Sequence, residues 1–251
     1  MVSCFHTHLK NKLDDHGKEK CEVFQQDHSK LDTVAFKGLT GKKQQKIVWD
    51  KNELCNQIGQ DFYEHYKQIG ILVEEDVLEL HDKPGVSAEE HVQSKTQVRF
   101  YHKLFCEWYA AHRLSQFTVS TCKCKVYNTL KHIDPFDLQY VYRFACGLNT
   151  SAADTIIKYL RRDTKTFENF VILCILEKSG STEEIKDAVR DFCSKNIRLR
   201  HSHSSILLWS TIQLLQIAST NKVRFRFILL CPDLRNSESG KKIALQISKI
   251  E

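Results

Sequence analysis

Apolar residues in the first third of the chain recur at two different spacings. In residues 28–39 they stand three and four positions apart, which predicts a short helix. In residues 51–68 an apolar side chain returns at every fourth position, which predicts one continuous helix with this buried face: Leu54, Ile58, Phe62 and Tyr66. Asp50 directly precedes that helix and Glu53 follows three residues later, a spacing typical of a capping box.

Extended segments lie on both sides of this helix. Residues 45–49 and 71–80 favour strands, and residues 97–102 favour a returning strand. The polar segment 81–96 contains a Pro-Gly pair and favours a long loop between the last two strands. This order of helices and strands predicts a winged-helix domain, in which a small helical bundle carries a β-hairpin as its wing. We expect no other β structure with the same clarity.

The chain becomes helical from Lys103 onward. Helix starts are expected at Asp134, which precedes Pro135, and at Ser151, which opens a capping box. Residues 204–218 are apolar nearly all round, which predicts a buried helix. Two segments share one plan, an apolar helix followed by a capped amphipathic helix, with a period of roughly thirty residues as in helical repeats. We therefore expect helix pairs that stack as in a solenoid.

These patterns predict a mainly α protein in four parts. An N-terminal arm or remnant helix covers residues 1–26, and a winged-helix domain with a small β-hairpin covers residues 27–117. A helical, superhelical or solenoid-like domain covers residues 118–235, and a polar C-terminal tail covers residues 236–251. Residues 223–230 alternate and then become apolar, which fits either a strand or the start of a further repeat.

Composition places this fold in an ordinary globular class. The hydrophobic fraction is 41% and the charged fraction is 27%, so the chain has enough apolar residues for a packed core. No run of about 18 or more apolar residues is present, so we expect no membrane-spanning helix. The first residues lack the apolar core of a signal peptide, and a cytoplasmic location is expected.

The ten cysteines favour buried, reduced thiols over a metal site. Three of them lie on apolar stripes: Cys146, Cys174 and Cys193. Cys122 and Cys124 are separated by one residue, not by the two that separate the cysteines of CxxC zinc and redox sites. Segment 4–8, Cys-Phe-His-Thr-His, has the residue types of metal ligands, but no second cluster has a matching spacing. We expect no metal.

No catalytic motif is present in the sequence. Segment 38–43, Gly-Leu-Thr-Gly-Lys-Lys, has the residue types of a phosphate-binding loop, but its glycines are too close and no Ser or Thr follows the lysine. We interpret the acidic run at 74–76 as turn charges and the His-Ser-His at 201–203 as an exposed helix start. The chain is therefore predicted not to be an enzyme, and no cofactor is expected on the isolated chain.

Two binding functions remain as alternatives. The net charge is +6, and the basic residues are spread along the chain, as is typical of a solvated surface. A winged helix that binds nucleic acid would place Lys51, Lys67 or Arg99 on phosphates, but residues 51–68 carry aromatic side chains where base-reading groups would be needed. A stand-alone helical scaffold would bind a protein partner along a concave face.

One stretch of the sequence is more informative about function than any other. The sequence VRFYHKLFCEWYAAHRL, residues 98–114, resembles the end of the winged-helix domain in NACHT proteins of the NOD-like receptor family. Residues 31–39, 68–77 and 132–149 resemble that domain's first helix, its run into the wing and the helical domain that follows. The matching positions of the central motif are Phe100, His102, Phe105, Glu107, Tyr109, Ala110 and Ala111.

The resemblance implies a regulatory module of an innate-immune NTPase. It places His102 on the phosphate of ADP, which a domain N-terminal to this region holds as ADP or as ATP with Mg²⁺. From the residues alone, a junction histidine hydrogen-bonded to a backbone carbonyl is the favoured explanation of His102. With the resemblance added, the structural role and the phosphate contact remain as two open alternatives. The chain departs from the family pattern at Cys106, where a glutamine is usual, and it lacks both the phosphate-binding loop and leucine-rich repeats. The implied partners are therefore proteins, namely its own or a neighbouring NACHT domain and sensor or oligomerising subunits.

Overall fold

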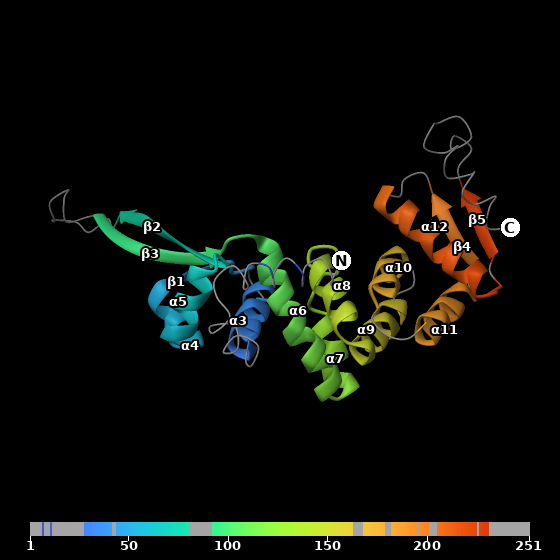
Figure 1. Ribbon diagram of the computed structural model, residues 1–251, viewed down its shortest axis with the longest axis horizontal. Helices are drawn as coiled ribbons and strands as arrows, with labels where there is room; N and C mark the ends of the chain where they lie inside the picture. Colours follow the sequence, from blue (N-terminus) through green and yellow to red (C-terminus); the bar gives the residue numbers. More distant parts are fainter. Residues whose placement is uncertain are drawn as a thin grey trace. The chain divides into compact units, whose positions relative to one another are not determined.

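The structure is a computed structural model that describes most of the chain (Figure 1). The described residues are 7, 11, 28–41, 44–80, 92–162, 168–178, 182–194, 196–200, 205–224 and 226–230. The arm, apart from Thr7 and Asn11, and the polar tail lie outside them. The His-Ser-His segment and the possible metal ligands Cys4, His6 and His8 also lie outside them. The chain divides into two compact units. The first comprises residues 1–117 and 131–134, and the second comprises residues 118–130 and 135–251.

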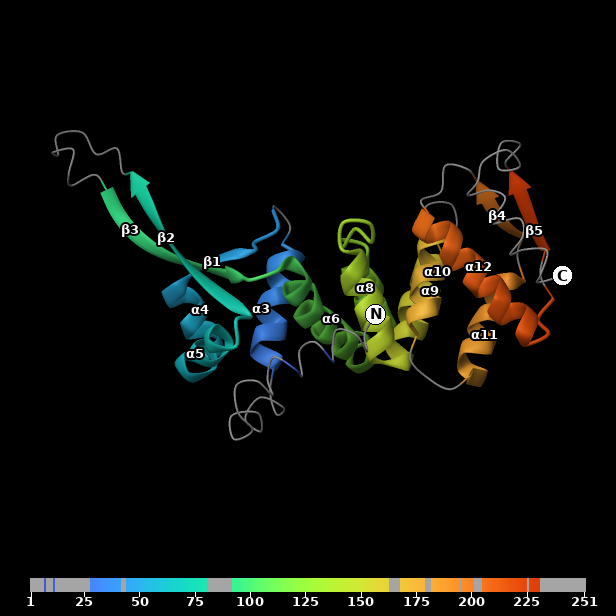
Figure 2. The ribbon, with the colours of Figure 1, turned by 45° about the horizontal axis from the view of Figure 1, so that its top comes forward.

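The first unit combines helices with a small antiparallel sheet, so the predicted mainly α fold with a β-hairpin is confirmed. The sheet has the strand order β1-β3-β2, and β2 and β3 form a long hairpin that extends from the helices (Figures 1 and 2). The elements are α3 (Ser29–Leu39), β1 (Val48–Asp50), α4 (Lys51–Ile58), α5 (Gln60–Gln68), β2 (Leu72–Leu80), β3 (Val92–Phe100) and α6 (Lys103–Ser120).

Aromatic side chains fill the core of this unit. Trp49 of β1 meets Phe100 of β3 edge to face, with ring centroids 5.8 Å apart, and Tyr66 of α5 meets Tyr109 of α6 at 5.9 Å. Edge-to-face contacts of this kind add to the free energy gained from burial. Gly38, the last residue but one of α3, lies against this core, where a Cβ atom would stand 2.4 Å from the carbonyl oxygen of Lys46. Only glycine fits that position.

The predicted continuous helix at residues 51–68 is wrong, because α4 and α5 are separated by Gly59. Gly59 has φ +96°, a left-handed conformation that glycine adopts readily and that ends α4. The break shifts the phase of the apolar face, so Tyr63 is fully buried while Phe62 is only partly buried. The spacing of four residues therefore wrongly predicted that Phe62, and not Tyr63, faces the core.

The predicted capping box is correct for Asp50 but not for Glu53. Asp50 accepts a hydrogen bond from the backbone N–H of Glu53 at 3.1 Å, which makes it the N-cap of α4. The Glu53 carboxylate turns instead to Lys46, whose Nζ lies 2.7 and 2.8 Å from its two oxygens. The reciprocal contact of a capping box is replaced by an ion pair to the preceding segment.

The second unit is built from packed helices and a short parallel sheet. Helix α10 packs against α8, α9 and α12, and α11 packs against α12, so helices two apart in the chain are in contact, as in stacked helix pairs (Figure 2). The elements are α7 (Lys123–Leu130), α8 (Gln139–Leu148), α9 (Thr150–Arg162), α10 (Glu168–Glu177), α11 (Thr182–Cys193), β4 (Asn196–Arg200), α12 (Ser205–Thr220) and β5 (Arg226–Leu230).

Two of the predicted helix starts in this unit are wrong. Residues 135–138 form turns, and α8 begins after Leu138 without a side-chain cap, so Asp134 and Pro135 do not open it. Helix α9 is capped by Asn149, whose Oδ1 accepts the N–H of Ala152 at 3.0 Å. Ser151 lies inside α9, because the asparagine two residues earlier satisfies the first free N–H groups of that helix.

The second unit also contains two strands, of which only β5 lies where a strand was one of two predicted alternatives, within residues 223–230. Strands β4 and β5 pair in parallel, with Asn196 opposite Arg226, and α12 connects them. Strand β4 was not predicted, because its five residues are too few for a clear alternating pattern. Helix α12 is not buried all round, because Ile206 and Trp209 are exposed. Among the described residues, no helix is both long and apolar enough to cross a membrane.

Candidate functional site

His102 stands at the junction between β3 and α6. Its Nδ1 accepts a hydrogen bond from the backbone N–H of Leu104 at 3.1 Å, and its carbonyl oxygen accepts the N–H of Phe105 at 3.0 Å. His102 is therefore the N-cap residue of α6, with an imidazole nitrogen in the place of the usual hydroxyl or carboxylate oxygen. One alternative from the sequence was that the His102 ring donates a hydrogen bond to a backbone carbonyl. In the structure the ring instead accepts a hydrogen bond from a backbone amide.

This contact fixes which ring nitrogen of His102 is available. With Nδ1 acting as an acceptor, the neutral imidazole carries its proton on Nε2. The side chain is exposed, so Nε2–H can donate to an incoming oxygen atom. The N-terminus of α6 adds a positive partial charge at the same place, which favours an anion.

A shallow hollow lies beside this junction. Its lining residues are Ile47, Arg99, Phe100, Tyr101, Lys103 and Cys106. Tyr101 and Ile47 are exposed large hydrophobic side chains, so the hollow has an apolar rim next to two basic residues. Arg99 is already paired with Glu75 across the hairpin. Lys103 lies 3.6 Å from Glu107, so the local positive charge is partly neutralised.

Two side chains beneath the junction are buried on the inner face of α6. Burial raises the pKa of the Glu107 carboxyl, while the neighbouring Lys103 lowers it. Burial also raises the pKa of the Cys106 thiol. Cys106 stands at the position where a glutamine is usual in the family that this sequence resembles. A buried, protonated thiol acts as a small apolar side chain and offers no amide to a ligand.

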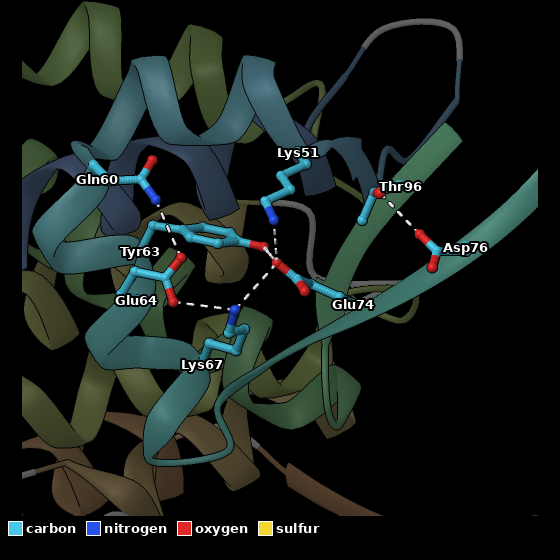
Figure 3. Close-up of polar contacts among 8 residues, drawn as sticks. All are labelled: Lys51, Gln60, Tyr63, Glu64, Lys67, Glu74, Asp76 and Thr96. Carbon is cyan, nitrogen blue, oxygen red and sulfur yellow. Dashed lines mark hydrogen bonds and ion pairs between the residues drawn. The ribbon is translucent and has the colours of Figure 1, made fainter. Parts of the chain in front are cut away.

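A second polar cluster joins the wing to the helices and was missed by the sequence analysis (Figure 3). One oxygen of Glu74, Oε1, accepts a hydrogen bond from the Tyr63 hydroxyl at 2.6 Å. The ammonium groups of Lys51 and Lys67 lie 2.9 and 3.4 Å from the same oxygen. Lys67 also contacts Glu64 at 3.0 Å. The acidic run at 74–76 therefore belongs to β2 and pairs with its neighbours, so its interpretation as turn charges is wrong.

The contacts around Glu74 shift two pKa values in opposite directions. The Tyr63 hydroxyl and the two lysines lower the pKa of the Glu74 carboxyl to about 2 from its usual value of 4.5. Burial and the adjacent Glu74 carboxylate raise the pKa of the Tyr63 hydroxyl. A carboxylate that stays charged and a phenol that stays protonated cannot exchange a proton near neutral pH. The cluster is therefore structural and fastens β2 to α4 and α5.

Glu74 should make this unit sensitive to acid. Because its folded pKa lies below its unfolded pKa, its contribution is present above about pH 4.5 and is lost as the pH falls toward 2. We expect Glu74→Gln to lower the free energy of unfolding by about 1–2 kcal/mol at pH 7, since water partly screens the group. Urea unfolding at pH 7 and pH 3 measures the difference. The matched exposed variant Glu75→Gln should change it far less, and equal effects would contradict the assignment.

The same contacts bear on nucleic-acid binding. The three cations proposed for phosphate contact are all engaged: Lys51 and Lys67 on Glu74, and Arg99 on Glu75. A phosphate would have to displace a carboxylate at each position. These contacts count against a winged helix that binds nucleic acid through Lys51, Lys67 or Arg99.

Helices of the second unit are joined by two partly buried ion pairs. Arg143 of α8 contacts Glu177 of α10 at 2.7 Å, and both side chains are 11% exposed. Lys178, which follows α10, contacts Asp154 of α9 at 2.8 Å. The cysteines predicted to be buried, Cys146, Cys174 and Cys193, are buried. Within the described ranges, no group of three or more histidine, cysteine or acidic side chains has the arrangement of a metal site.

Comparison with known proteins does not add to this geometry. No protein-family model matches the chain, and no curated protein matches it significantly.

Proposed function

We propose that this chain is a non-catalytic regulatory module of a NOD-like receptor type signalling NTPase. In this proposal a nucleotide-binding domain of the NACHT type holds ADP, or ATP with Mg²⁺, and His102 donates a hydrogen bond from Nε2 to a phosphate oxygen. The observation that carries the proposal is the capped junction, because Nδ1 of His102 is occupied by the Leu104 amide and Nε2 carries the exposed proton. The sequence around it is the one that resembles the family.

The fold supports a role in transmitting nucleotide state. Helix α6 begins directly after His102 and continues to Ser120, a length of about 27 Å at the usual rise per residue. A movement of its N-terminus is therefore carried along a single rigid element. At the other side of the junction, β3 pairs with both β1 and β2, which anchors the strand that precedes His102. Loss of the phosphate contact would bias α6 between two positions, as a ligand-dependent switch requires.

The proposed partners follow from this role. The module would contact its own or a neighbouring NACHT domain, together with sensor or oligomerising subunits, in the cytoplasm. The chain itself offers no magnesium-binding acid beside a phosphate-binding loop, since none of its three Gly-Lys pairs follows another glycine at the spacing that such a loop needs. Nucleotide and magnesium would therefore be held by the other domain.

A helical scaffold that binds a protein partner is the second candidate. It is favoured by Ile206 and Trp209 of α12, which stand three positions apart on one helix face and are both exposed. Exposed aromatic residues of this kind often anchor protein interfaces. A scaffold would bind its partner equally well with and without ADP, whereas the regulatory module would not.

The proposal predicts that the isolated chain binds ADP weakly. With no phosphate-binding loop, we expect a Kd above about 1 mM for ADP in isothermal titration. The same titration with ATP and Mg²⁺ should show no hydrolysis. Binding in the micromolar range by the isolated chain would contradict the proposal, because a single histidine and a helix N-terminus do not supply that affinity.

A further inference from the structure

Cys122 and Cys124 form an exposed pair of thiols at the start of α7. The carbonyl oxygen of Cys122 accepts the N–H of Val126 at 3.1 Å, so Cys122 is the N-cap of a helix that begins at Lys123. Cys124 lies in the first turn. Both side chains are exposed, and their Sγ atoms are 3.0 Å apart.

The position of the cap explains this close approach. Side chains two apart inside a helix face different directions and do not meet. Cys122 lies just outside α7, so its side chain can fold back over the first turn and reach Cys124. The spacing that excluded a CxxC site in the sequence therefore brings two thiols together at this helix start.

We propose that Cys122 and Cys124 form a redox-active dithiol that is oxidised reversibly by low-molecular-weight disulfides. The inference is independent of the nucleotide-sensing role proposed for His102, since it concerns a different helix and a different chemistry. It assigns a modification site to the chain, with small disulfides such as glutathione disulfide as the substrate class.

Cys122 has the properties of the attacking thiol. The Cys124 thiol and the backbone N–H of Lys125 lower the pKa of the Cys122 thiol, and the charge of Lys125 adds to this effect. The thiolate is the nucleophile in disulfide exchange. Four described cysteines differ in this respect, because burial raises the pKa of Cys55, Cys106, Cys146 and Cys193.

The distance between the sulfur atoms favours a disulfide over a bound metal ion. Two thiolates on one zinc ion, each about 2.3 Å from the metal in tetrahedral geometry, stand about 3.8 Å apart. The observed 3.0 Å is shorter, and no third histidine, cysteine or acidic side chain joins the pair within the described ranges. Closing the disulfide needs the sulfur atoms to approach by about 1 Å more.

The reaction proceeds by two exchanges. The Cys122 thiolate attacks one sulfur of glutathione disulfide, forms a mixed disulfide and releases one glutathione thiolate. The Cys124 thiol then loses its proton to solvent and attacks Cys122 Sγ, which forms the Cys122–Cys124 bond and releases the second glutathione thiolate. The two protein thiols are oxidised by two electrons, and one small disulfide is reduced to two thiols. Excess glutathione reverses both steps.

Tryptic mapping provides a direct test, because trypsin cleaves after Lys123, between the two cysteines. The full chain is incubated with glutathione disulfide, alkylated, digested and analysed by mass spectrometry without reduction. We expect residues 114–123 to remain linked to residues 124–125, and reduction to separate them. Cys124→Ser should instead accumulate glutathione on Cys122, and Cys122→Ser should react at least tenfold more slowly at Cys124.

Two results would overturn the proposal. One is the absence of linked peptides over the whole range of glutathione ratios, with both cysteines alkylated at the rate of an ordinary exposed thiol. The other is a stable glutathione adduct on the wild-type chain that never closes to the Cys122–Cys124 disulfide. Neither substitution should unfold the chain, since both side chains are exposed, and far-UV circular dichroism of each variant checks this.

Discussion

Trp108→Ala is expected to lower the free energy of unfolding by about 3–5 kcal/mol, as for other large buried aromatic side chains. Trp108 lies on the inner face of α6 and is 1% exposed. Its ring meets His112 edge to face at a centroid distance of 5.0 Å. Truncation leaves a cavity in the core on which α6 packs, and a core closes such a cavity only in part.

Urea unfolding followed by far-UV circular dichroism measures this change without depending on tryptophan fluorescence. Trp209→Ala is the matched control, since Trp209 is 47% exposed and should cost much less. A small loss for Trp108→Ala, comparable to that for Trp209→Ala, would show that α6 does not pack through this side chain.

Glu177→Ala is expected to destabilise the second unit by about 3 kcal/mol, because it leaves a largely buried guanidinium without its carboxylate. Arg143 donates to Glu177 through one nitrogen, and its buried Nε has no hydrogen-bond partner among the described residues. The remaining stabilisation of the Arg143 charge comes from the Tyr140 ring at 5.7 Å. That contact does not replace an ion pair.

The double variant Arg143→Met with Glu177→Leu separates the cost of a buried charge from the worth of the pair. Replacing both groups with apolar ones should restore stability to within about 1 kcal/mol of the wild type. Asp187→Ala breaks an exposed pair with Arg190 and should change stability by less than about 0.5 kcal/mol. If the double variant were as unstable as Glu177→Ala, lost packing would be the cause and not an unpaired charge.

The elements that local patterns specify well were predicted from the sequence. The first helix, a β-hairpin and a helix from Lys103 onward were predicted, and the structure contains all three. The hairpin is longer than predicted, because residues 92–96, which were assigned to its loop, belong to β3. Asp50 was found because a cap depends on residues three positions apart. Gly59 was not recognised as a break, because the apolar positions on both sides of it still fit one helical repeat.

The parts that depend on long-range pairing were not predictable from local patterns. Strands β4 and β5 are only five residues each and are stabilised by pairing across an intervening helix. The Glu74 cluster brings together side chains from α4, α5 and β2, and its residues carry no common motif. Cys122 and Cys124 are separated by one residue in sequence, but the cap geometry that joins them is not visible in their spacing.

His102 shows the limit of the resemblance most clearly. The motif placed the histidine at a strand-to-helix junction, and the structure has it there. The resemblance did not reveal that Nδ1 caps α6, which is a local contact independent of any ligand. A substitution at this position therefore changes both helix stability and any contact to phosphate, and a test of function must separate the two effects.

The measurement that tests the central claim most directly compares His102→Asn with His102→Ala in a chain that carries a NACHT-type nucleotide-binding domain ahead of this module. Asparagine retains an N-cap acceptor, whereas alanine removes it, so the pair separates capping from phosphate contact. If Nε2 donates to ADP, both variants should weaken ADP binding by about tenfold, the value of one charge-assisted hydrogen bond. Unchanged ADP affinity in His102→Asn would contradict the account and leave His102 as a helix cap alone.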